Sequence, residues 1–341
     1  MGQKKKVNYL VYKWKDGRPF FISPLHNTGG GNSYGYSTGR DLCQQALLSA
    51  GWEFDTNAEL VVHYISPHFY VDIPRRVNIL FTMWENEWLP DDLLEPFKQV
   101  DYVIVPSENS KVAIRNAKVD TPVYVCHHAV DSEFYHWRQR VSKPKKIQCL
   151  WVGSPNLRKG YDILTKTWYE LFQKTDDNVL LYMKSSRFKA KGEYLPMERF
   201  KAVLDTRNMS PAELRSLYWD SHIFLFPSRG EGAGLPPLEA MSTGLPVLAP
   251  AWSGMADYIF APVAYPLEYD LEVMRYGCDA EMAQVDIPHF KRTILEVMNN
   301  LGRGYIRGKA ASDMVRHEFS IKRMGERMTE ILTDIQEREG V

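Results

Sequence analysis

Cysteine is scarce in this chain, and its copies lie far apart. The four cysteines, Cys43, Cys126, Cys149 and Cys278, form no C-x-x-C pair. A disulfide framework and a cysteine-ligated zinc site are therefore not expected. Free thiols are typical of proteins in a reducing compartment, so we predict a cytoplasmic location.

Long apolar runs are also missing, and neither sign of charge prevails. No stretch approaches the roughly 18 apolar residues that cross a bilayer, so no integral membrane segment is predicted. Lys plus Arg and Asp plus Glu number 42 each, which gives a net charge of zero. A protein that depends on non-specific contacts with nucleic-acid phosphates would carry a basic excess, so this class is disfavoured.

The order of apolar and amphipathic segments predicts an α/β protein. The chain has 341 residues, 44% of them hydrophobic, which suits two domains of ordinary size. Short apolar runs alternate with amphipathic segments in both halves, and this alternation is typical of parallel sheets covered by helices. We expect two Rossmann-like domains, 1–143 and 144–318, facing each other across a cleft. A C-terminal helix over 319–341 is expected to pack back on the first domain.

Individual strands and helices can be placed on the same pattern. Strands are expected near residues 8–12, 20–22, 60–65, 77–81, 102–105, 123–126, 147–152, 179–183, 201–204, 223–226 and 247–249. Helices are expected over 37–50, 109–116, 159–173, 210–220 and 237–242, and from 288 nearly to the end of the chain. Ser210, Pro211 and Glu213 have the pattern of a capping box, which marks the start of one of these helices.

The Gly-rich segment 228–250 carries the clearest chemical signal. Its pattern is strand, loop, short helix and strand, with Gly230, Gly232 and Gly234 in the loop. Glycines let backbone amides approach a ligand closely, and the start of the following helix offers a dipole that favours an anion. The segment therefore indicates a phosphate-binding site.

Two carboxylates beside such a site need an explanation. Glu231 lies in the loop and Glu239 about one turn into the helix, and a phosphate would repel both. Their presence makes sense if they accept hydrogen bonds from hydroxyl groups, as a nucleotide sugar offers. The alternative is a plain strand–loop–helix turn with two surface glutamates.

The segment resembles the E-x7-E stretch of the family-4 glycosyltransferases, which have the GT-B fold. Glu231 and Glu239 are separated by seven residues, within E-G-A-G-L-P-P-L-E-A-M-S-T-G-L-P-V. Further segments resemble that family in the same order along the chain: Pro106-Ser107-Glu108, Ala129-Val130-Asp131, Trp151-Val152-Gly153, Arg158-Lys159-Gly160 and 210–228. The resemblance is strongest over residues 147–260 and weaker before residue 100.

This resemblance implies a function and a role for individual residues. The family transfers a sugar from a nucleotide-sugar donor to a hydroxyl acceptor, mostly with retention of anomeric configuration. It implies that Glu239 binds the ribose hydroxyls, Glu231 contacts the transferred sugar and Lys159 neutralises the diphosphate. Glu231 and Lys159 are thus the expected catalytic residues. The other expected donor-binding residues are Gly153, Ser154, Arg158, Lys184, Gly232, Ala233, Gly234 and Leu235.

One position departs from the family pattern. The family usually has an arginine directly after the glycine of its first donor-domain strand, and this chain has Ser154. The diphosphate would lose one cation there. Arg158 and Lys184 are two candidates to replace it, and the sequence leaves both open.

Two features of the first half are expected on the acceptor or phosphate side of the site. Gly30 and Gly31 sit where the family carries a glycine loop in its acceptor domain. Glu85 follows a predicted strand within M-W-E-N-E-W-L-P, where tryptophan faces suit sugar stacking, with core packing as the alternative. The glycine string Gly29–Gly35 also spaces like some dinucleotide fingerprints, so an NAD(P)-dependent oxidoreductase stays open as a further reading.

No cofactor and no metal are expected. Asp-x-Asp, the metal–diphosphate motif of the other major glycosyltransferase fold, does not occur in the chain. The pairs His127–His128 and His63/His68 lack a third ligand at suitable spacing, so hydrogen-bonded histidines near a strand end are expected instead.

The partners predicted are a nucleotide-sugar donor and a hydroxyl acceptor. The class of the acceptor stays open among a glycan, a lipid-linked sugar, a small molecule, a protein and a modified nucleic-acid base. A catalytically silent nucleotide- or sugar-binding module is the competing function.

Overall fold

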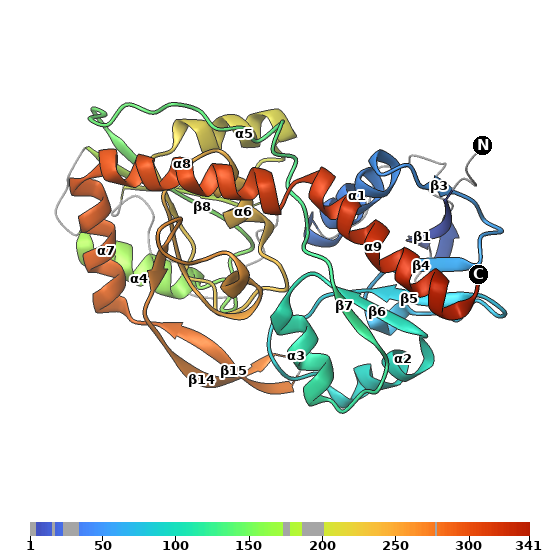
Figure 1. Ribbon diagram of the computed structural model, residues 1–341. Helices are drawn as coiled ribbons and strands as arrows, with labels where there is room; N and C mark the ends of the chain where they lie inside the picture. The colour runs from blue at the N-terminus through green and yellow to red at the C-terminus, as the bar shows by residue number, and fades with distance from the viewer. Residues whose placement is uncertain (1–4, 16–17, 23–33, 173–177, 186–200, 277) are drawn as a thin grey trace. The chain divides into compact units, whose positions relative to one another are not determined.

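The computed structural model describes residues 5–15, 18–22, 34–172, 178–185, 201–276 and 278–341. The chain forms two compact units, and Figure 1 labels their helices and most of their strands. Unit 1 comprises residues 1–131, 275–280 and 319–341, and unit 2 comprises residues 132–274 and 281–318. Each unit contains its own sheet and its own core.

Unit 1 is built on a mainly parallel sheet with the strand order β2-β1-β4-β5-β6-β7, and β3 pairs with β1 off this path. β1 and β2 are antiparallel, and the other neighbours are parallel. Apolar runs such as VNILF in β5 are largely buried, as expected for parallel strands covered on both faces. The strands are β1 (Lys6–Lys15), β2 (Arg18–Ile22), β3 (Glu53–Phe54), β4 (Leu60–Tyr64), β5 (Val77–Phe81), β6 (Tyr102–Val105) and β7 (Val123–Val125).

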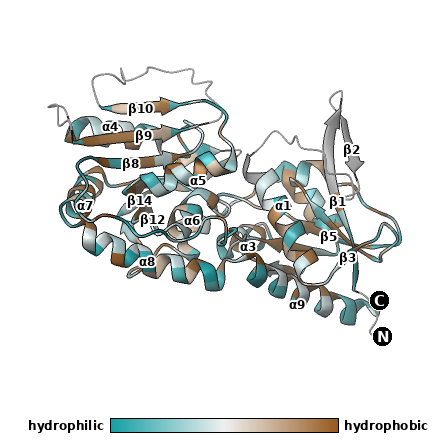
Figure 2. Ribbon diagram, turned by 90° about the horizontal axis from the view of Figure 1, so that it is seen from above, coloured by the Kyte–Doolittle hydropathy of each residue, from teal (hydrophilic) through white to brown (hydrophobic). Residues whose placement is uncertain are grey.

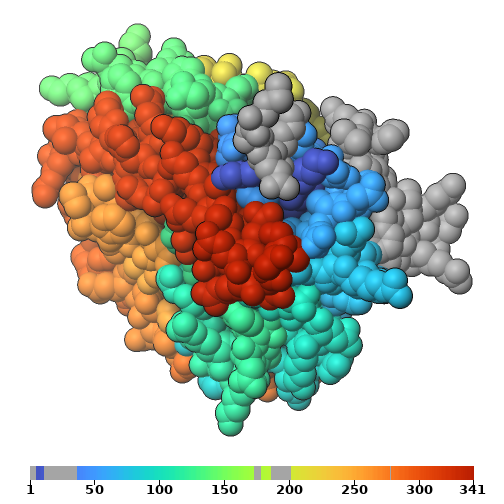
Figure 3. All heavy atoms as spheres, turned by 45° about the vertical axis from the view of Figure 1, so that its right-hand side comes forward, coloured from blue at the N-terminus to red at the C-terminus, as the bar shows by residue number. Residues whose placement is uncertain are grey.

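The helices of unit 1 come from both ends of the chain. They are α1 (Tyr34–Ser49), α2 (Leu94–Gln99), α3 (Glu108–Asn116) and α9 (Ile321–Glu339). α9 packs along α1, and Gly325 permits the approach, because a Cβ there would lie 2.5 Å from the carbonyl oxygen of Ala46. Met328, Ile331 and other residues of α9 belong to the apolar core of this unit, and Figure 3 shows this red helix against blue and cyan residues. The C-terminal helix therefore completes unit 1.

Unit 2 has a six-stranded parallel sheet in the order β10-β9-β8-β11-β12-β13. Numbered from β8, this order is 3-2-1-4-5-6, the Rossmann order, which reverses between β8 and β11. Figure 2 shows β9 largely in brown, because its residues are almost all apolar. The strands are β8 (Ile147–Val152), β9 (Val179–Lys184), β10 (Ala202–Asp205), β11 (Ile223–Leu225), β12 (Val247–Pro250) and β13 (Tyr265–Leu267).

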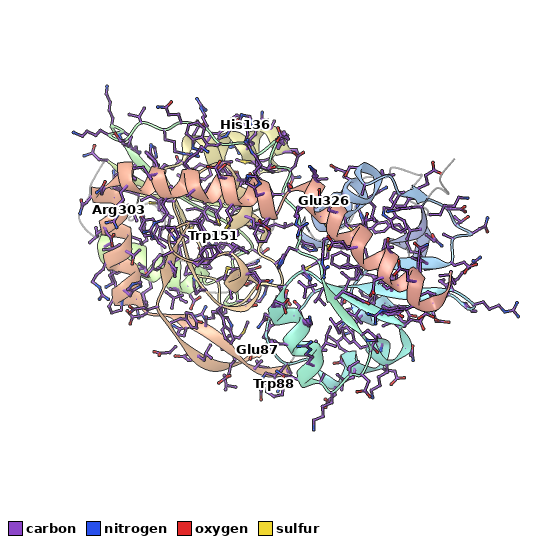
Figure 4. The ribbon with its side chains drawn as sticks, viewed as in Figure 1. Glu87, Trp88, His136, Trp151, Arg303 and Glu326 are labelled. Carbon is purple, nitrogen blue, oxygen red and sulfur yellow. The ribbon has the colours of Figure 1, made fainter. Side chains whose placement is uncertain are left out.

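Five helices of the described chain cover this sheet or extend from it. They are α4 (Tyr161–Leu171), α5 (Pro211–Asp220), α6 (Leu235–Ser242), α7 (Ile287–Asn299) and α8 (Leu301–Glu318). The indole of Trp151, labelled in Figure 4, is completely buried in the core of unit 2. A hairpin of β14 (Tyr269–Tyr276) and β15 (Cys278–Val285) follows β13.

The α/β class predicted from the sequence is confirmed, and most elements lie close to their expected bounds. The strand expected at 147–152 is β8, and α5 ends at Asp220 as expected. The capping box is present: Ser210 Oγ accepts from the Glu213 amide, and the Glu213 carboxylate accepts from the Ser210 amide at 2.7 Å. The apolar pattern of the sequence did not predict α2, β3, β13 or the hairpin β14–β15. These are short or rich in charged residues, so no apolar period marked them.

Candidate active site

Two loops of unit 2 flank the point at which the strand order reverses. One loop follows β8 and leads to Gly160, and the other follows β11 and leads to Gly234. The Arg229 amide joins them by donating to the carbonyl oxygen of Arg158 at 2.7 Å. Ligands of such sheets bind at this reversal. Most of the expected site residues lie on these loops.

Gly160 explains how closely the two loops approach. Its φ is 65°, in the left-handed region that favours glycine, and it precedes α4. A Cβ at this position would lie 1.8 Å from the carbonyl oxygen of Pro227, so no side chain fits. The preceding residue, Lys159, therefore lies directly beside the second loop, with Nζ 5.6 Å from the centre of the Phe226 ring.

Glu231 lies at the centre of a cluster of donors. Lys159 Nζ donates to its two carboxylate oxygens at 2.7 and 2.6 Å, and Ser228 Oγ donates to Oε1 at 2.6 Å. Arg158 Nη1 is 3.5 Å from Oε2. Burial alone would raise the pKa of Glu231, but the charges of Lys159 and Arg158 hold that pKa below its ordinary value. The two predicted catalytic residues thus form one buried ion pair.

The backbone after Glu231 is held from one side by Tyr258. Tyr258 Oη lies 2.9 Å from the carbonyl oxygen of Ala233 and 3.0 Å from that of Gly234. Gly234 has a φ of 79°, and a Cβ there would lie 2.3 Å from the same hydroxyl. Within the described part of the chain, the amides of Gly232, Ala233 and Gly234 have no hydrogen-bond partner. Consecutive amides of this kind are suited to bind an anion.

Two further residues, which no sequence motif had indicated, hold the loops in place. Arg229 is buried and forms a two-pronged pair with Asp162, with both contacts at 2.7 Å, and it donates to Gln284 Oε1 at 3.0 Å. Ser253 Oγ donates to the carbonyl oxygen of Glu231 at 2.6 Å and accepts from its amide at 3.1 Å. Because these partners lie far apart in the sequence, no local motif could have paired them.

Glu239 lies on α6 in very different surroundings. It is 3% exposed, and Tyr218 Oη donates to its Oε2 at 2.7 Å. Burial raises the pKa of Glu239 to about 7, and the Tyr218 hydroxyl opposes this rise only in part. Both glutamates of the motif are therefore buried, and the alternative of two surface glutamates is wrong.

The candidates for the missing cation occupy different places. The ammonium of Lys184 donates to the carbonyl oxygens of Ser185, Asp205 and Arg207, and it lies 3.8 Å from Asp205 Oδ1. Burial lowers its pKa. Arg158, by contrast, donates to the carbonyl oxygen of Gly230 at 2.7 Å, beside Glu231. The structure thus brings Arg158, and not the ammonium of Lys184, into contact with the Glu231 loop.

Gly153 and Ser154 lie at the carboxyl end of β8, as expected. The Gly153 amide donates to the carbonyl oxygen of Lys184 at 3.0 Å, which continues the pairing of β8 with β9. A Cβ at Gly153 would lie 3.0 Å from the Trp151 ring, so this ring restricts the position to a small residue. The two residues form the start of the first loop.

The residues expected on the acceptor side belong to unit 1. Gly30 and Gly31 lie outside the described residues. Glu85 is half-buried in the loop after β5, where Trp84 Nε1 donates to Oδ1 of the fully buried Asn86 at 3.0 Å. Trp88, seen beside α3 in Figure 4, is 48% exposed. The loop therefore has an internal polar core and one tryptophan at its surface.

The histidines form hydrogen bonds, as expected. His128 Nε2 lies 2.7 Å from Tyr64 Oη, and His127 Nδ1 lies 3.0 Å from the carbonyl oxygen of Pro106. Burial lowers the pKa of His128 to about 3, so its ring is neutral at physiological pH. Among the described residues, no three His, Cys, Asp or Glu side chains are arranged to hold a metal. No described helix is long and apolar enough to cross a membrane.

Residues 146–263 match the family described as glycosyl transferases group 1. This segment contains both loops of the site. The lipopolysaccharide glucosyltransferase WaaG of Escherichia coli K12 is 30% identical over 131 residues, which cover 37% of this chain and 34% of that protein. The sulfoquinovosyl transferase SQD2 of Arabidopsis thaliana is 27% identical over 173 residues, which cover 48% and 33%. A putative glycosyltransferase 45 of a Sulfolobus islandicus filamentous virus is 28% identical, with 54% and 53% covered. The chain therefore matches about a third to a half of the length of these relatives.

Solved structures show the same fold over nearly the whole chain. WaaG has a TM-score of 0.61 at 14% identity, with 96% of this chain and 99% of that chain covered. Anabaena Alr3699/HepE in complex with UDP-glucose has a TM-score of 0.64 at 12% identity, with the same coverage. The chain has two Rossmann-like domains of the GT-B type, as predicted.

Proposed function

We propose that this chain is a glycosyltransferase that moves a sugar from a nucleotide-sugar donor to a hydroxyl acceptor, with retention of anomeric configuration and without a metal ion. One observation carries the proposal. The buried Lys159–Glu231 ion pair joins the two loops at the reversal of strand order in unit 2, and Glu231 directly precedes three consecutive amides that have no hydrogen-bond partner among the described residues. The match to glycosyl transferases group 1 covers this arrangement.

We assign the nucleotide sugar to the two loops because they offer positive charges and hydrogen-bond donors. The amides of residues 232–235 bind the diphosphate, and Lys159 and Arg158 balance its charge. Glu239 accepts hydrogen bonds from the ribose hydroxyls, and Glu231 contacts the transferred sugar. Arg158 supplies the cation that the family arginine would supply at position 154, because its guanidinium lies beside Glu231.

The chemical step needs stabilisation of a leaving group. The bond between the anomeric carbon and the diphosphate oxygen breaks, and the electron pair goes to the diphosphate. The acceptor oxygen forms the new bond on the same face of the sugar, and its proton passes to a diphosphate oxygen. Lys159 and the loop amides are more strongly engaged as the diphosphate charge grows, which lowers the barrier.

A ligand screen followed by a turnover assay tests the proposal. The melting temperature is measured with UDP, GDP, ADP, CMP and TDP and with their sugars, and at least one nucleotide should raise it. That nucleotide sugar is then incubated with the protein without an acceptor, with and without EDTA. Slow hydrolysis that EDTA leaves unchanged is expected. A protein that none of these nucleotides stabilises would contradict the proposal.

The competing function is a silent binding module, which Ser154 favours because it removes one cation from the diphosphate site. The same assay separates the two functions. A module would bind the nucleotide sugar and leave it intact even with a mixture of glycan, lipid-linked and small-molecule acceptors, whereas an enzyme would release the free nucleotide.

The acceptor side is assigned to the loop after β5 in unit 1. Trp88 offers an exposed aromatic face, and Glu85 offers a carboxylate for a hydroxyl. The free thiols of the four cysteines support the predicted cytoplasmic location. The turnover assay with separate classes of acceptor identifies the class that this loop binds.

A further inference from the structure

Glu239 has an unusual environment for a buried carboxyl group. No described Lys, Arg or His forms an ion pair with it, and Tyr218 Oη is its hydrogen-bond partner among the described side chains. This hydroxyl meets Oε2, and no described group donates to Oε1. A buried carboxyl group with one neutral partner is costly to the folded state. Such a group is better explained by a ligand that completes its hydrogen bonds than by packing alone.

Tyr218 itself is tightly fixed. Tyr218 lies on α5 and its side chain is completely buried. Its ring lies edge-on to Tyr135, with ring centres 5.9 Å apart and an interplanar angle of 85°. Phe224 packs on it at 5.9 Å. Its hydroxyl also lies 3.4 Å from the carbonyl oxygen of Pro236, in the first turn of α6. The hydroxyl is therefore held at one place against α6.

Arg140 holds the same two helices together at their C-terminal ends. Its guanidinium donates to the carbonyl oxygens of Tyr218 and Ser221 at the end of α5, at 3.1 and 3.2 Å. It also donates to the carbonyl oxygen of Thr243, after α6, at 2.7 Å. The position of the Glu239 carboxylate relative to α5 is thus set twice, by the guanidinium of Arg140 at the helix ends and by the hydroxyl of Tyr218.

We propose that Tyr218 is a positioning residue that turns the Glu239 carboxyl group so that Oε1 is presented to the 2′,3′-diol of a ribonucleotide. Tyr218 makes the site selective for ribonucleotides over 2′-deoxyribonucleotides, and it does so through Glu239 without touching the ligand. This inference rests on the proposed function, because it needs a nucleotide in unit 2. The raised pKa of Glu239 agrees with a carboxyl group whose hydrogen bonds are incomplete before the ligand binds.

Calorimetry with matched nucleotides tests this role. The affinities of UDP, GDP and ADP and of their 2′-deoxy counterparts are measured for the wild type and for Tyr218→Phe, which removes only the hydroxyl. The wild type should prefer the ribonucleotide, and Tyr218→Phe should reduce that preference by about fivefold or more, the effect of one lost hydrogen bond. The affinity for the 2′-deoxynucleotide, which keeps only the 3′-hydroxyl of the diol, should fall less than the affinity for the ribonucleotide.

Tyr102→Phe is the matched control. Tyr102 Oη donates to Glu339 at 2.6 Å in unit 1, so this variant removes a tyrosine–glutamate hydrogen bond of the unit to which no nucleotide is assigned. It should leave the preference unchanged. A double-mutant cycle adds a second readout: in a Glu239→Gln background, Tyr218→Phe should no longer affect the preference.

Each result decides between positioning and simple packing. Equal losses of both affinities in Tyr218→Phe, or an effect that persists fully in the Glu239→Gln background, would overturn the inference while leaving the proposed function intact. A wild type that binds none of these six nucleotides, and neither CMP nor TDP, would overturn both.

Discussion

Glu231 and Glu239 come from one short motif and are both buried, but the protein surrounds them in opposite ways. Glu231 receives hydrogen bonds from Lys159 and Ser228, with Arg158 at 3.5 Å. Glu239 receives one from the neutral hydroxyl of Tyr218. Desolvation raises the pKa of both, and only at Glu231 do neighbouring cations outweigh it.

The difference separates two kinds of binding group. An ionised Glu231 keeps its charge at any physiological pH and fixes the position of Lys159, the cation expected at the diphosphate. Burial raises the pKa of Glu239 to about 7, so this carboxyl group can take up or release a proton near neutral pH. The same residue type therefore serves as a permanent charge in the loop and as an incomplete hydrogen-bonding group on the helix.

The largest effect is expected from breaking the ion pair. Lys159→Met should lower the free energy of unfolding by about 3 kcal/mol, because it leaves Glu231 buried with one cation fewer. It should also reduce turnover by about a hundredfold. Urea denaturation and an assay of donor turnover measure the two effects.

A surface ion pair provides the control for that experiment. Lys291 pairs with Glu170 on the outside of unit 2, where both side chains are about 30% exposed, so Lys291→Met should cost less than about 1 kcal/mol. The double variant of Lys159→Met with Glu231→Gln should recover part of the lost stability. Equal costs for Lys159 and Lys291 would show that the buried pair carries no special weight.

Glu231→Gln is expected to separate rate from affinity. The variant keeps the size of the side chain and removes its charge, so turnover should fall by about tenfold or more, or at least about 1.4 kcal/mol. The affinity for the free nucleoside diphosphate should stay nearly unchanged, because Glu231 is assigned to the sugar. Calorimetry and steady-state rates check this; a parallel loss of both would refute the sugar contact.

The pH dependence of nucleotide binding should reveal Glu239. The ribose hydroxyls donate to the ionised form, so binding releases a proton, and with a pKa of about 7 the affinity should fall by up to about tenfold from pH 8 to pH 6. Glu239→Gln should abolish this dependence. Calorimetry in two buffers of different ionisation enthalpy detects the released proton, and an affinity independent of pH in the wild type would contradict the assignment.

The stability of the free protein should depend on Glu239 in the opposite direction. Because the folded-state pKa lies above the ordinary 4.5, protonated Glu239 stabilises the folded state fully below about pH 4.5, and this contribution is lost as the pH rises through 7. Glu239→Gln should therefore raise the melting temperature at pH 8 and change it little at pH 5. An equal change at both pH values would indicate that Glu239 does not titrate in this range.

The smallest effect is expected at Lys184. Its ammonium is bound to carbonyl oxygens around Asp205 and Arg207 and not to the Glu231 loop. Lys184→Met should therefore change nucleotide affinity by less than about twofold, whereas Arg158→Met should weaken it by about fivefold or more. Calorimetry with the preferred nucleoside diphosphate compares the two, and the reverse order would make Lys184 the replacement for the missing arginine.

The sequence by itself determined the local structure and the place of the site. Apolar runs flanked by Gly, Pro and capping residues predicted most strands and helices. The reason is that a few neighbouring residues set the backbone preference and show whether a strand is buried on both faces. The loop glycines of 230–234 indicated a site at a strand end for the same reason, and Lys159 was added to it only by the family resemblance. The need for glycine at Gly160 became evident only where Pro227 approaches it.

Only the tertiary structure decided the chemical state of the site. Tyr218 and Glu239 lie on different helices, and Lys159 and Glu231 on loops after different strands, so no spacing in the sequence relates them. The pKa of a carboxyl group depends on burial and on charges within a few ångströms, and folding sets both. For this reason the sequence could name two glutamates but not their ionisation, whereas the fold pairs Glu231 with cations and leaves Glu239 with one neutral hydrogen-bond partner among the described side chains.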